Sequence, residues 1–234
     1  ADMSYFGALR VLDLSDNRLD AMEGLGGLTG LRALSLSLNR VVNPGTWEAG
    51  AAFQLLSTLD LSHNALDPHA TLGAQSPLGE LPALRELNCS SNGWRALPSI
   101  LGHFPALEML KLAGNKLTGS ALGALSTLPA LLHLSLARNA VEGLPGVTGR
   151  ESGLEEALAG AGIDALSSYP HLEVMDLSDN RVCEAYAVEP LRCLPRLRAL
   201  LLAGNPLAAA ASQAAKRAAQ KRDKARALAE RGAL

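Results

Sequence analysis

Histidine and cysteine are the residue types in this chain most able to bind a metal ion or to attack a substrate. The five histidines are scattered: His63, His69, His103, His133 and His171. None lies at metal-ligand spacing from a cysteine or carboxylate partner, and the three cysteines form no CxxC pair. We therefore predict no metal site and no bound cofactor.

Two further catalytic patterns are absent from the sequence. The glycine-rich stretch from Gly24 to Gly30 lacks the lysine with which a phosphate-binding loop contacts its nucleotide. No G-x-S-x-G motif positions a nucleophilic serine. The sequence therefore predicts a protein that is not an enzyme and has no catalytic residues.

Positive charge is concentrated at one end of the chain. Residues 208–234 carry 7 Lys and Arg against 2 Asp and Glu, whereas residues 1–207 carry 14 against 21. The basic run comprises Lys216, Arg217, Lys221, Arg222, Lys224 and Arg226. It is either a solvated helix face or a contact with an acidic surface, such as a microtubule, an acidic protein or RNA. Because no aromatic residue is interleaved for base stacking, nucleic acid is the least favoured partner.

Asparagine, whose amide can donate and accept hydrogen bonds at once, recurs in a phrase of the form L-x-x-L-x-L-x-x-N-x-L. Eight copies begin near Leu9 and end at Leu207. Their asparagines are Asn17, Asn39, Asn64, Asn92, Asn115, Asn139, Asn180 and Asn205. The intervals between them are 22, 25, 28, 23, 24, 41 and 25 residues, so the phrase marks an internal repeat.

The phrase itself predicts a fold. L-x-L is a short strand whose leucines share one side, and each repeat must return the chain to start the next parallel strand. The turn leaves main-chain groups inside the coil, and a buried asparagine amide can pair with them. Leu-Pro and similar pairs before several strands favour short 3₁₀ or α turns. We expect an α/β solenoid, curved like a horseshoe, with a concave parallel sheet of about eight strands and a C-terminal helix.

The eight phrases resemble the leucine-rich-repeat superfamily, and most closely its intracellular 22-residue class. That class includes phosphatase-regulatory, tubulin-linked and ciliary axoneme proteins. The arrangement of the repeats is also similar to that of the X-ray radiation resistance-associated protein family. It has Phe53–Leu66, then Phe104–Asn139, then an interruption, and then a final pair of repeats. The resemblance implies a protein that binds other proteins.

Two segments depart from the repeat. The 41-residue interval contains an insertion at about residues 142–168, in which Ser152 and Glu155 form a capping box for a short helix. This insertion is either a binding element or a passive loop. We therefore divide the chain into a solenoid at residues 1–207, with this insertion, and a basic helix at 208–234 whose near end caps the core.

The residues flanking the strand leucines should face the concave surface, where a protein partner would bind. They are small, polar and mildly acidic, and they lack large aromatic anchors. The candidate partner face comprises Asp13, Asp60, Glu86, Asn88, Met109, Lys111, His133, Asp176 and Leu201. An unused, solvated face is the alternative interpretation.

The cellular compartment that we expect for this protein follows from three features that the sequence lacks. There is no apolar run of about 18 residues, no signal peptide and no cysteine-rich cap, so we expect a reducing, cytoplasmic location without a membrane. The chain does not begin with Met, and we expect it to be a processed or partial copy of a longer protein.

The leading functional hypothesis is a structural adaptor of the ciliary or flagellar axoneme, or of another cytoskeletal assembly, with tubulin or axonemal proteins among several partners. The alternatives are a subunit that docks a phosphatase or small GTPase in its concave face, and an RNA-binding adaptor that uses the basic helix.

Overall fold

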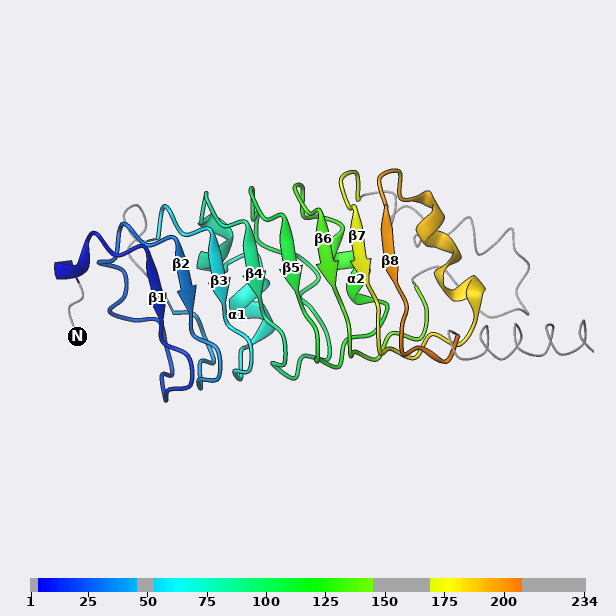
Figure 1. Ribbon diagram of the computed structural model, residues 1–234, viewed down its shortest axis with the longest axis horizontal. Helices are drawn as coiled ribbons and strands as arrows, with labels where there is room; N and C mark the ends of the chain where they lie inside the picture. The colour runs from blue at the N-terminus through cyan, green and yellow to red at the C-terminus, as the bar shows by residue number, and fades with distance from the viewer. Residues whose placement is uncertain (1–3, 46–52, 145–168, 208–234) are drawn as a thin grey trace, which may run out of the picture.

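The computed structural model describes residues 4–45, 53–144 and 169–207, and these form one parallel sheet in chain order (Figure 1). Each strand has three residues: β1 (Val11–Asp13), β2 (Ala33–Ser35), β3 (Thr58–Asp60), β4 (Glu86–Asn88), β5 (Met109–Lys111), β6 (His133–Ser135), β7 (Val174–Asp176) and β8 (Ala199–Leu201). The sheet is open, with β1 and β8 at its opposite ends. The predicted solenoid with a parallel sheet of eight strands is confirmed.

Strand register follows the repeat phrase. The middle residue of each strand pairs with the middle residue of the next, from Leu12 with Leu34 to Met175 with Leu200. Side chains alternate along a strand, so these middle residues share the inner side of the sheet. Leu34 and Met175 are buried, whereas Leu12 and Leu200, at the two ends, are only half-buried. Within the described residues, the core therefore runs along the solenoid and is less completely covered at β1 and β8.

Short helical segments lie on the side of the sheet that faces the core, and they carry the chain from one strand to the start of the next. They are the α-helices α1 (Pro68–Leu72) and α2 (Ala121–Leu125) and the 3₁₀ segments η2 (Pro77–Glu80) and η3 (Ala185–Cys193). A further 3₁₀ turn, η1 (Ser4–Phe6), precedes β1. α1 begins where Asp67 accepts the main-chain N–H of Ala70 at 2.7 Å, and proline occupies the first helical position. The predicted 3₁₀ and α turns are confirmed.

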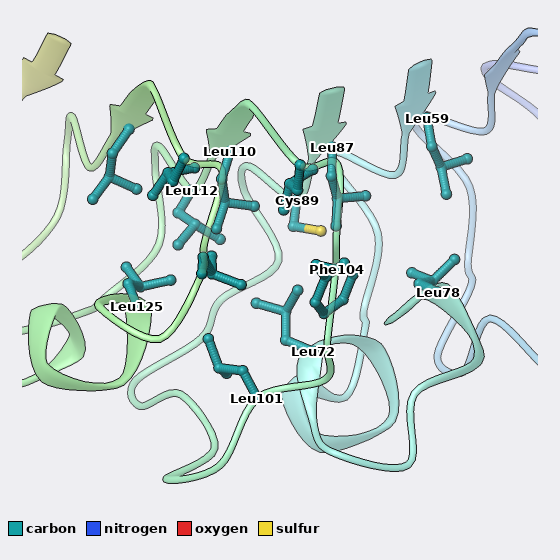
Figure 2. Close-up of a cluster of buried hydrophobic side chains, with 14 of the residues drawn as sticks. Leu59, Leu72, Leu78, Leu87, Cys89, Leu101, Phe104, Leu110, Leu112 and Leu125 are labelled. Atoms are coloured by element: carbon teal, nitrogen blue, oxygen red, sulfur yellow. The ribbon is translucent and has the colours of Figure 1, made fainter. Parts of the chain in front are cut away.

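Leucines from the strands and from the return segments meet in one core (Figure 2). Leu110 of β5 and Leu72 of α1 are both buried, as is Phe104, which precedes the fifth coil. Burying a leucine side chain contributes about 1.5–3 kcal/mol, so the stacked coils stabilise one another where a single coil could not. Cys89 takes the place of a core leucine, and the sulfur is fully buried among these side chains.

The residue before each repeat asparagine adopts a left-handed backbone conformation. Its φ angle lies between 53° and 74° in all eight coils, yet only Gly114 and Gly204 are glycines at this position. The other six residues are Asp16, Leu38, His63, Ser91, Arg138 and Asp179. This conformation turns the chain out of the strand, and it costs about 1–2 kcal/mol for a residue with a Cβ atom.

Leu38 is the least suitable of these residues, because it is a branched apolar residue that leaves half of its side chain exposed. Replacing Leu38 with asparagine, which tolerates this conformation, should raise the free energy of unfolding by about 0.5–1 kcal/mol. Urea unfolding followed by circular dichroism measures the change. Leu55 is similarly exposed but is not left-handed, so Leu55→Asn should give no gain. An equal gain from both variants would contradict the backbone explanation.

The predicted insertion helix from Ser152 and the predicted basic helix at 208–234 lie outside the described residues. Leu144 and Tyr169, the described residues on either side of 145–168, are both held by hydrogen bonds to other coils. Leu144 is buried and its N–H donates to the carbonyl of Ala187 at 3.2 Å. Tyr169 is also buried, and its hydroxyl donates to the carbonyl of Leu122 at 2.6 Å. The two flanking positions are therefore held by neighbouring coils.

Candidate functional site

The repeat asparagines link each coil to the one before it. Asn180 shows the pattern: its amide oxygen accepts the N–H of Val141 at 2.9 Å, and its amide nitrogen donates to the carbonyl of Leu136 at 2.9 Å. Both partners belong to the preceding coil. The same nitrogen also donates to Leu177 and Ser178 within its own turn. One buried side chain thus pairs with main-chain groups of two coils.

Six other asparagines repeat this arrangement: Asn39, Asn64, Asn92, Asn115, Asn139 and Asn205. In all seven, the amide oxygen accepts a main-chain N–H of the preceding coil at 2.9–3.1 Å. The amide nitrogen donates to a carbonyl of that coil at 2.8–3.1 Å. Among the described residues, no buried side-chain nitrogen or oxygen lacks a hydrogen-bond partner.

Asn17 departs from the expected buried ladder. It is exposed, and among the described residues its amide nitrogen donates only to Leu14 and Ser15 of its own coil. The physical reason is its position in the first described coil, where no other described coil packs against its outer side. The prediction of a buried, bridging amide at Asn17 is therefore wrong.

The sheet register places the candidate partner residues on one surface, the outer face of the sheet, which we call the strand face. One column contains Glu86, Met109 and His133, which lie next to one another on adjacent strands. A second column contains Asp13, Asp60, Asn88, Lys111, Asp176 and Leu201. Most of them are half-exposed, and Asp13 and Leu201 are exposed. The geometry gives continuous columns of accessible side chains along the sheet.

Four of these residues also have a structural role that the sequence analysis missed. Asp13, Asp60, Asn88 and Asp176 each accept, through a side-chain oxygen, the N–H of the serine two residues later at 2.8–3.1 Å. Such a bond closes the turn that follows the strand. Hydrogen bonds from the side chain and N–H of Ser15 hold the pKa of Asp13 below its usual value. The recurring pattern Asp/Asn-x-Ser was the available signal.

Ion pairs on and beside the strand face connect neighbouring coils in the middle of the sheet. The Lys111 ammonium lies 2.5 Å from a carboxylate oxygen of Glu86, and Arg85 pairs with Glu108. Both pairs are partly exposed, so each contributes no more than about 1 kcal/mol. Their main effect is to neutralise charge on β4 and β5 and on the residues just before them, next to Met109.

Cys89 and the two other cysteines differ sharply in accessibility. Burial raises the pKa of the Cys89 thiol, and the negative charge of Asp60 adds to that shift. Cys183 and Cys193 are exposed and free. Since the thiolate is the reactive form, Cys89 should be inert in the folded protein.

We expect a thiol-reactive disulfide reagent to label two cysteines rapidly in the native chain and a third only after unfolding. Counting the released chromophore in buffer and in guanidinium chloride tests this. Labelling of all three thiols at one rate under native conditions would show that the coil around Cys89 opens readily.

Other candidate sites gain no support from the described residues. Within residues 4–45, 53–144 and 169–207, no three histidine, cysteine or acidic side chains are grouped closely enough to hold a metal ion. No helix in the same ranges is long and apolar enough to cross a membrane. The basic run from Lys216 to Arg226 lies outside the described part of the chain, so its contact with a partner stays a prediction.

Sequence relatives match parts of the chain. No protein-family model matches it. The chain is 32% identical over 119 residues to an adenylate cyclase of Podospora anserina, covering 50% of this chain and 5% of that protein. It is 35% identical over 116 residues to the mouse transforming growth factor beta activator LRRC32, covering 47% of this chain and 17% of the relative. The chain therefore spans only a small share of either relative's length.

Solved structures give broader coverage. The mouse RP105 chain of the RP105/MD-1 complex superimposes with a TM-score of 0.65 at 27% identity, over 87% of this chain and 31% of that one. Human 5T4 superimposes with a TM-score of 0.56 at 25% identity, over 85% of this chain and 70% of that one. An internalin of Listeria monocytogenes, InlF, superimposes with a TM-score of 0.53 at 21% identity, over 85% of this chain and 49% of that one.

These comparisons do not separate the intracellular 22-residue class from other classes, so that assignment stays a prediction. The superfamily itself follows from the parallel sheet, the bridging asparagines and the structural neighbours together. The chain is a leucine-rich-repeat protein.

Proposed function

We propose that this chain is a non-catalytic scaffold that binds another protein through the strand face. The observation that carries the proposal is the register of the sheet, which arranges outward side chains of eight strands in continuous, accessible columns. Bridging asparagines join the coils behind these columns. A surface held this firmly loses little conformational entropy when a partner binds.

The part of the strand face from β5 to β8 is the best candidate for the centre of the interface. Met109 and His133 lie side by side on β5 and β6, and Val174 continues their column on β7. Leu201 on β8 is 47% exposed although it is a large apolar residue. Apolar and imidazole groups surrounded by polar residues resemble the anchor-and-rim composition of protein interfaces.

Cross-linking mass spectrometry of the native protein would identify the partner and the residues that contact it. The partner should then bind the purified wild-type chain, and Leu201→Asp should weaken that binding at least about tenfold. Ile100→Asp is the matched control, because Ile100 is an equally apolar and more exposed side chain outside the strands. Equal loss in both variants, or none in Leu201→Asp, would exclude this part of the strand face.

At the level of the cell, we propose a structural adaptor in a cytoskeletal assembly, and specifically in the ciliary or flagellar axoneme. The support is the resemblance of the repeats to the 22-residue class, together with an acidic body and a basic terminal segment that suit packing against charged neighbours. Tubulin and axonemal proteins are the proposed partners.

Extraction of cilia with detergent and then with salt tests this assignment. An axonemal adaptor should remain with the detergent-extracted axoneme and leave at high salt, because charged contacts are screened. Release by detergent alone, together with co-purification of a phosphatase or a small GTPase, would favour a soluble regulator instead. Steeply salt-dependent binding to RNA would favour the basic segment as a nucleic-acid contact.

A further inference from the structure

The fourth coil contains the one Asn-Gly pair of the whole sequence, Asn92-Gly93. Asparagine is a chemically labile residue, because the main-chain nitrogen of the following residue can attack its side-chain carbonyl carbon. Glycine in the following position hinders this attack least, since it has no side chain. Asn92 is also one of the asparagines that link neighbouring coils. A residue on which the stacking depends is therefore part of a reactive pair.

The fold requires both members of this pair. The amide oxygen of Asn92 accepts the N–H of Leu66, and its nitrogen donates to the carbonyl of Leu61, both at 3.1 Å. These bonds join the third and fourth coils. Gly93 has a φ angle of 77°, a left-handed conformation that strains a residue with a Cβ atom. Of the eight residues that follow a repeat asparagine, Gly93 alone has a positive φ, so glycine is favoured at this position by the backbone.

Deamidation of this pair needs only the chain and water. The main-chain nitrogen of Gly93 gives up its proton to solvent and bonds to Cγ of Asn92. The bond from Cγ to Nδ2 breaks, and the nitrogen takes a proton from water and leaves as ammonia, so that a cyclic succinimide forms. Water then opens the ring at either carbonyl. One product has aspartate at this position, and the other has isoaspartate, in which the main chain runs through Cγ.

Hydrogen bonds of the folded coil hold the Asn92 amide away from this attack. Its nitrogen donates to the carbonyls of Cys89 and Ser90 at 3.0 and 3.1 Å. Both residues precede Asn92, so the side chain is directed away from the nitrogen of Gly93, which follows it. With the bonds to the third coil, four hydrogen bonds of the amide must break before Cγ can turn toward Gly93. The reaction therefore requires local opening of the fourth coil.

We propose that Asn92 is a deamidation site and that opening of the fourth coil controls its rate. The closed coil suppresses the reaction, and each opening exposes the reactive pair to water. The product does not restore the link between the coils, because a carboxylate has no N–H to donate to the carbonyls of Leu61 and Cys89. Isoaspartate also lengthens the main chain in this turn. Deamidation thus weakens the junction of the third and fourth coils permanently.

Peptide mapping by mass spectrometry tests the proposal on the full chain, incubated with a thiol reductant at neutral pH in buffer and in urea. The tryptic peptide from Glu86 to Arg95 contains both Asn92 and Asn88, and fragmentation distinguishes them. In the unfolded chain Asn92 should deamidate, whereas Asn88, which cysteine follows, is the internal control and should stay intact. In the folded chain Asn92 should react at least about tenfold more slowly, because only the open state reacts. A synthetic peptide of residues 86–95 in both solutions corrects for the effect of urea on the chemistry.

A pair of variants tests whether coil opening sets the rate. The Asn115 amide oxygen accepts the N–H groups of Asn92 and Trp94, each at 3.0 Å, and holds the fourth coil from its other side. Asn115→Ala should therefore speed deamidation of Asn92 in the native chain at least about threefold. Asn17→Ala is the matched control and should leave the rate unchanged, since Asn17 bonds to described residues of its own turn in the first coil.

Three results would overturn the proposal. Equal rates at Asn92 in the folded and unfolded wild-type chain would show that the coil does not protect the amide. An unreactive Asn92 in the unfolded chain would show that the pair is not a deamidation site. A native rate that a folded Asn115→Ala variant leaves unchanged would show that coil opening does not control the reaction. If Asn115→Ala does not fold, the comparison of folded and unfolded wild-type chain still decides.

Discussion

Replacing Asn180 with alanine should lower the free energy of unfolding by about 3 kcal/mol. The variant would leave the N–H of Val141 and the carbonyl of Leu136 without the partner that joins them across two coils. An unsatisfied buried main-chain group costs about 1–3 kcal/mol, and two groups are affected here. Asn180 is 6% exposed, so water has little access to replace the lost bonds. Urea unfolding followed by circular dichroism measures the difference.

Asn17 provides an unusually close control. The residues from Asp13 to Arg18 and from Asp176 to Arg181 have the same sequence, DLSDNR, so the local chain is identical at both sites. Asn17 is exposed, and its hydrogen bonds to described residues all lie within its own turn. Asn17→Ala should therefore cost less than about 1 kcal/mol. Equal losses in the two variants would show that the asparagine stabilises its own turn and does not link neighbouring coils.

The fold was predictable from the sequence because one periodic pattern encodes both the strand and the return of the chain. Leu110 in the middle of β5 and Leu112 just after the strand must both face the core, and this requirement fixes the register. The exposure of leucines in the first coil could not be predicted in this way. The repeat phrase around Leu12 is as regular as the phrase around Leu34, although Leu12 is more exposed. Only the position of a coil in the stack determines whether its leucines are covered.

The left-handed turns were missed because sequence signals for this conformation depend on glycine. Gly114 and Gly204 carry that signal, but Leu38 and Arg138 adopt the same φ range without it. In these coils, the N–H of the left-handed residue donates to a carbonyl of the next coil, Ser62 for Leu38 and Ser178 for Arg138, and this packing holds the conformation. Tertiary contacts thus outweigh the local preference of the residue.

The partner face was predictable only as a set of positions. Sheet geometry decides that Met109 and His133 face outward, and the structure places them together. Packing imposes no requirement on an outward side chain, so the sequence alone cannot say whether Asp60 binds a partner or closes its own turn. The structure shows that its side chain accepts the N–H of Ser62, and this bond accounts for an acidic residue at that position.

Replacing Gly119 with alanine should lower the free energy of unfolding by about 2–3 kcal/mol. A Cβ atom at this position would lie 1.8 Å from the carbonyl oxygen of Gly143 and 3.0 Å from its carbon. Both atoms are main chain in the adjacent coil, so no side chain can rotate to make room. The two coils must separate locally, and overpacking of this kind costs about 1–3 kcal/mol or occasionally more. Thermal and urea unfolding both report the loss.

Gly123, four residues further along the same coil, separates the steric effect from the general effect of removing a glycine. It lies within α2, and apart from its chain neighbours and the backbone of its own helix, a Cβ atom there would meet no heavy atom of the described residues within 4 Å. Gly123→Ala should therefore stabilise the protein by about 0.5–1 kcal/mol, since alanine loses less entropy in a helix. Opposite signs at the two glycines are the expected result. A gain at both positions would mean that the coils are not in close contact at Gly119, and that the stacking described for this part of the solenoid is looser than the structure shows.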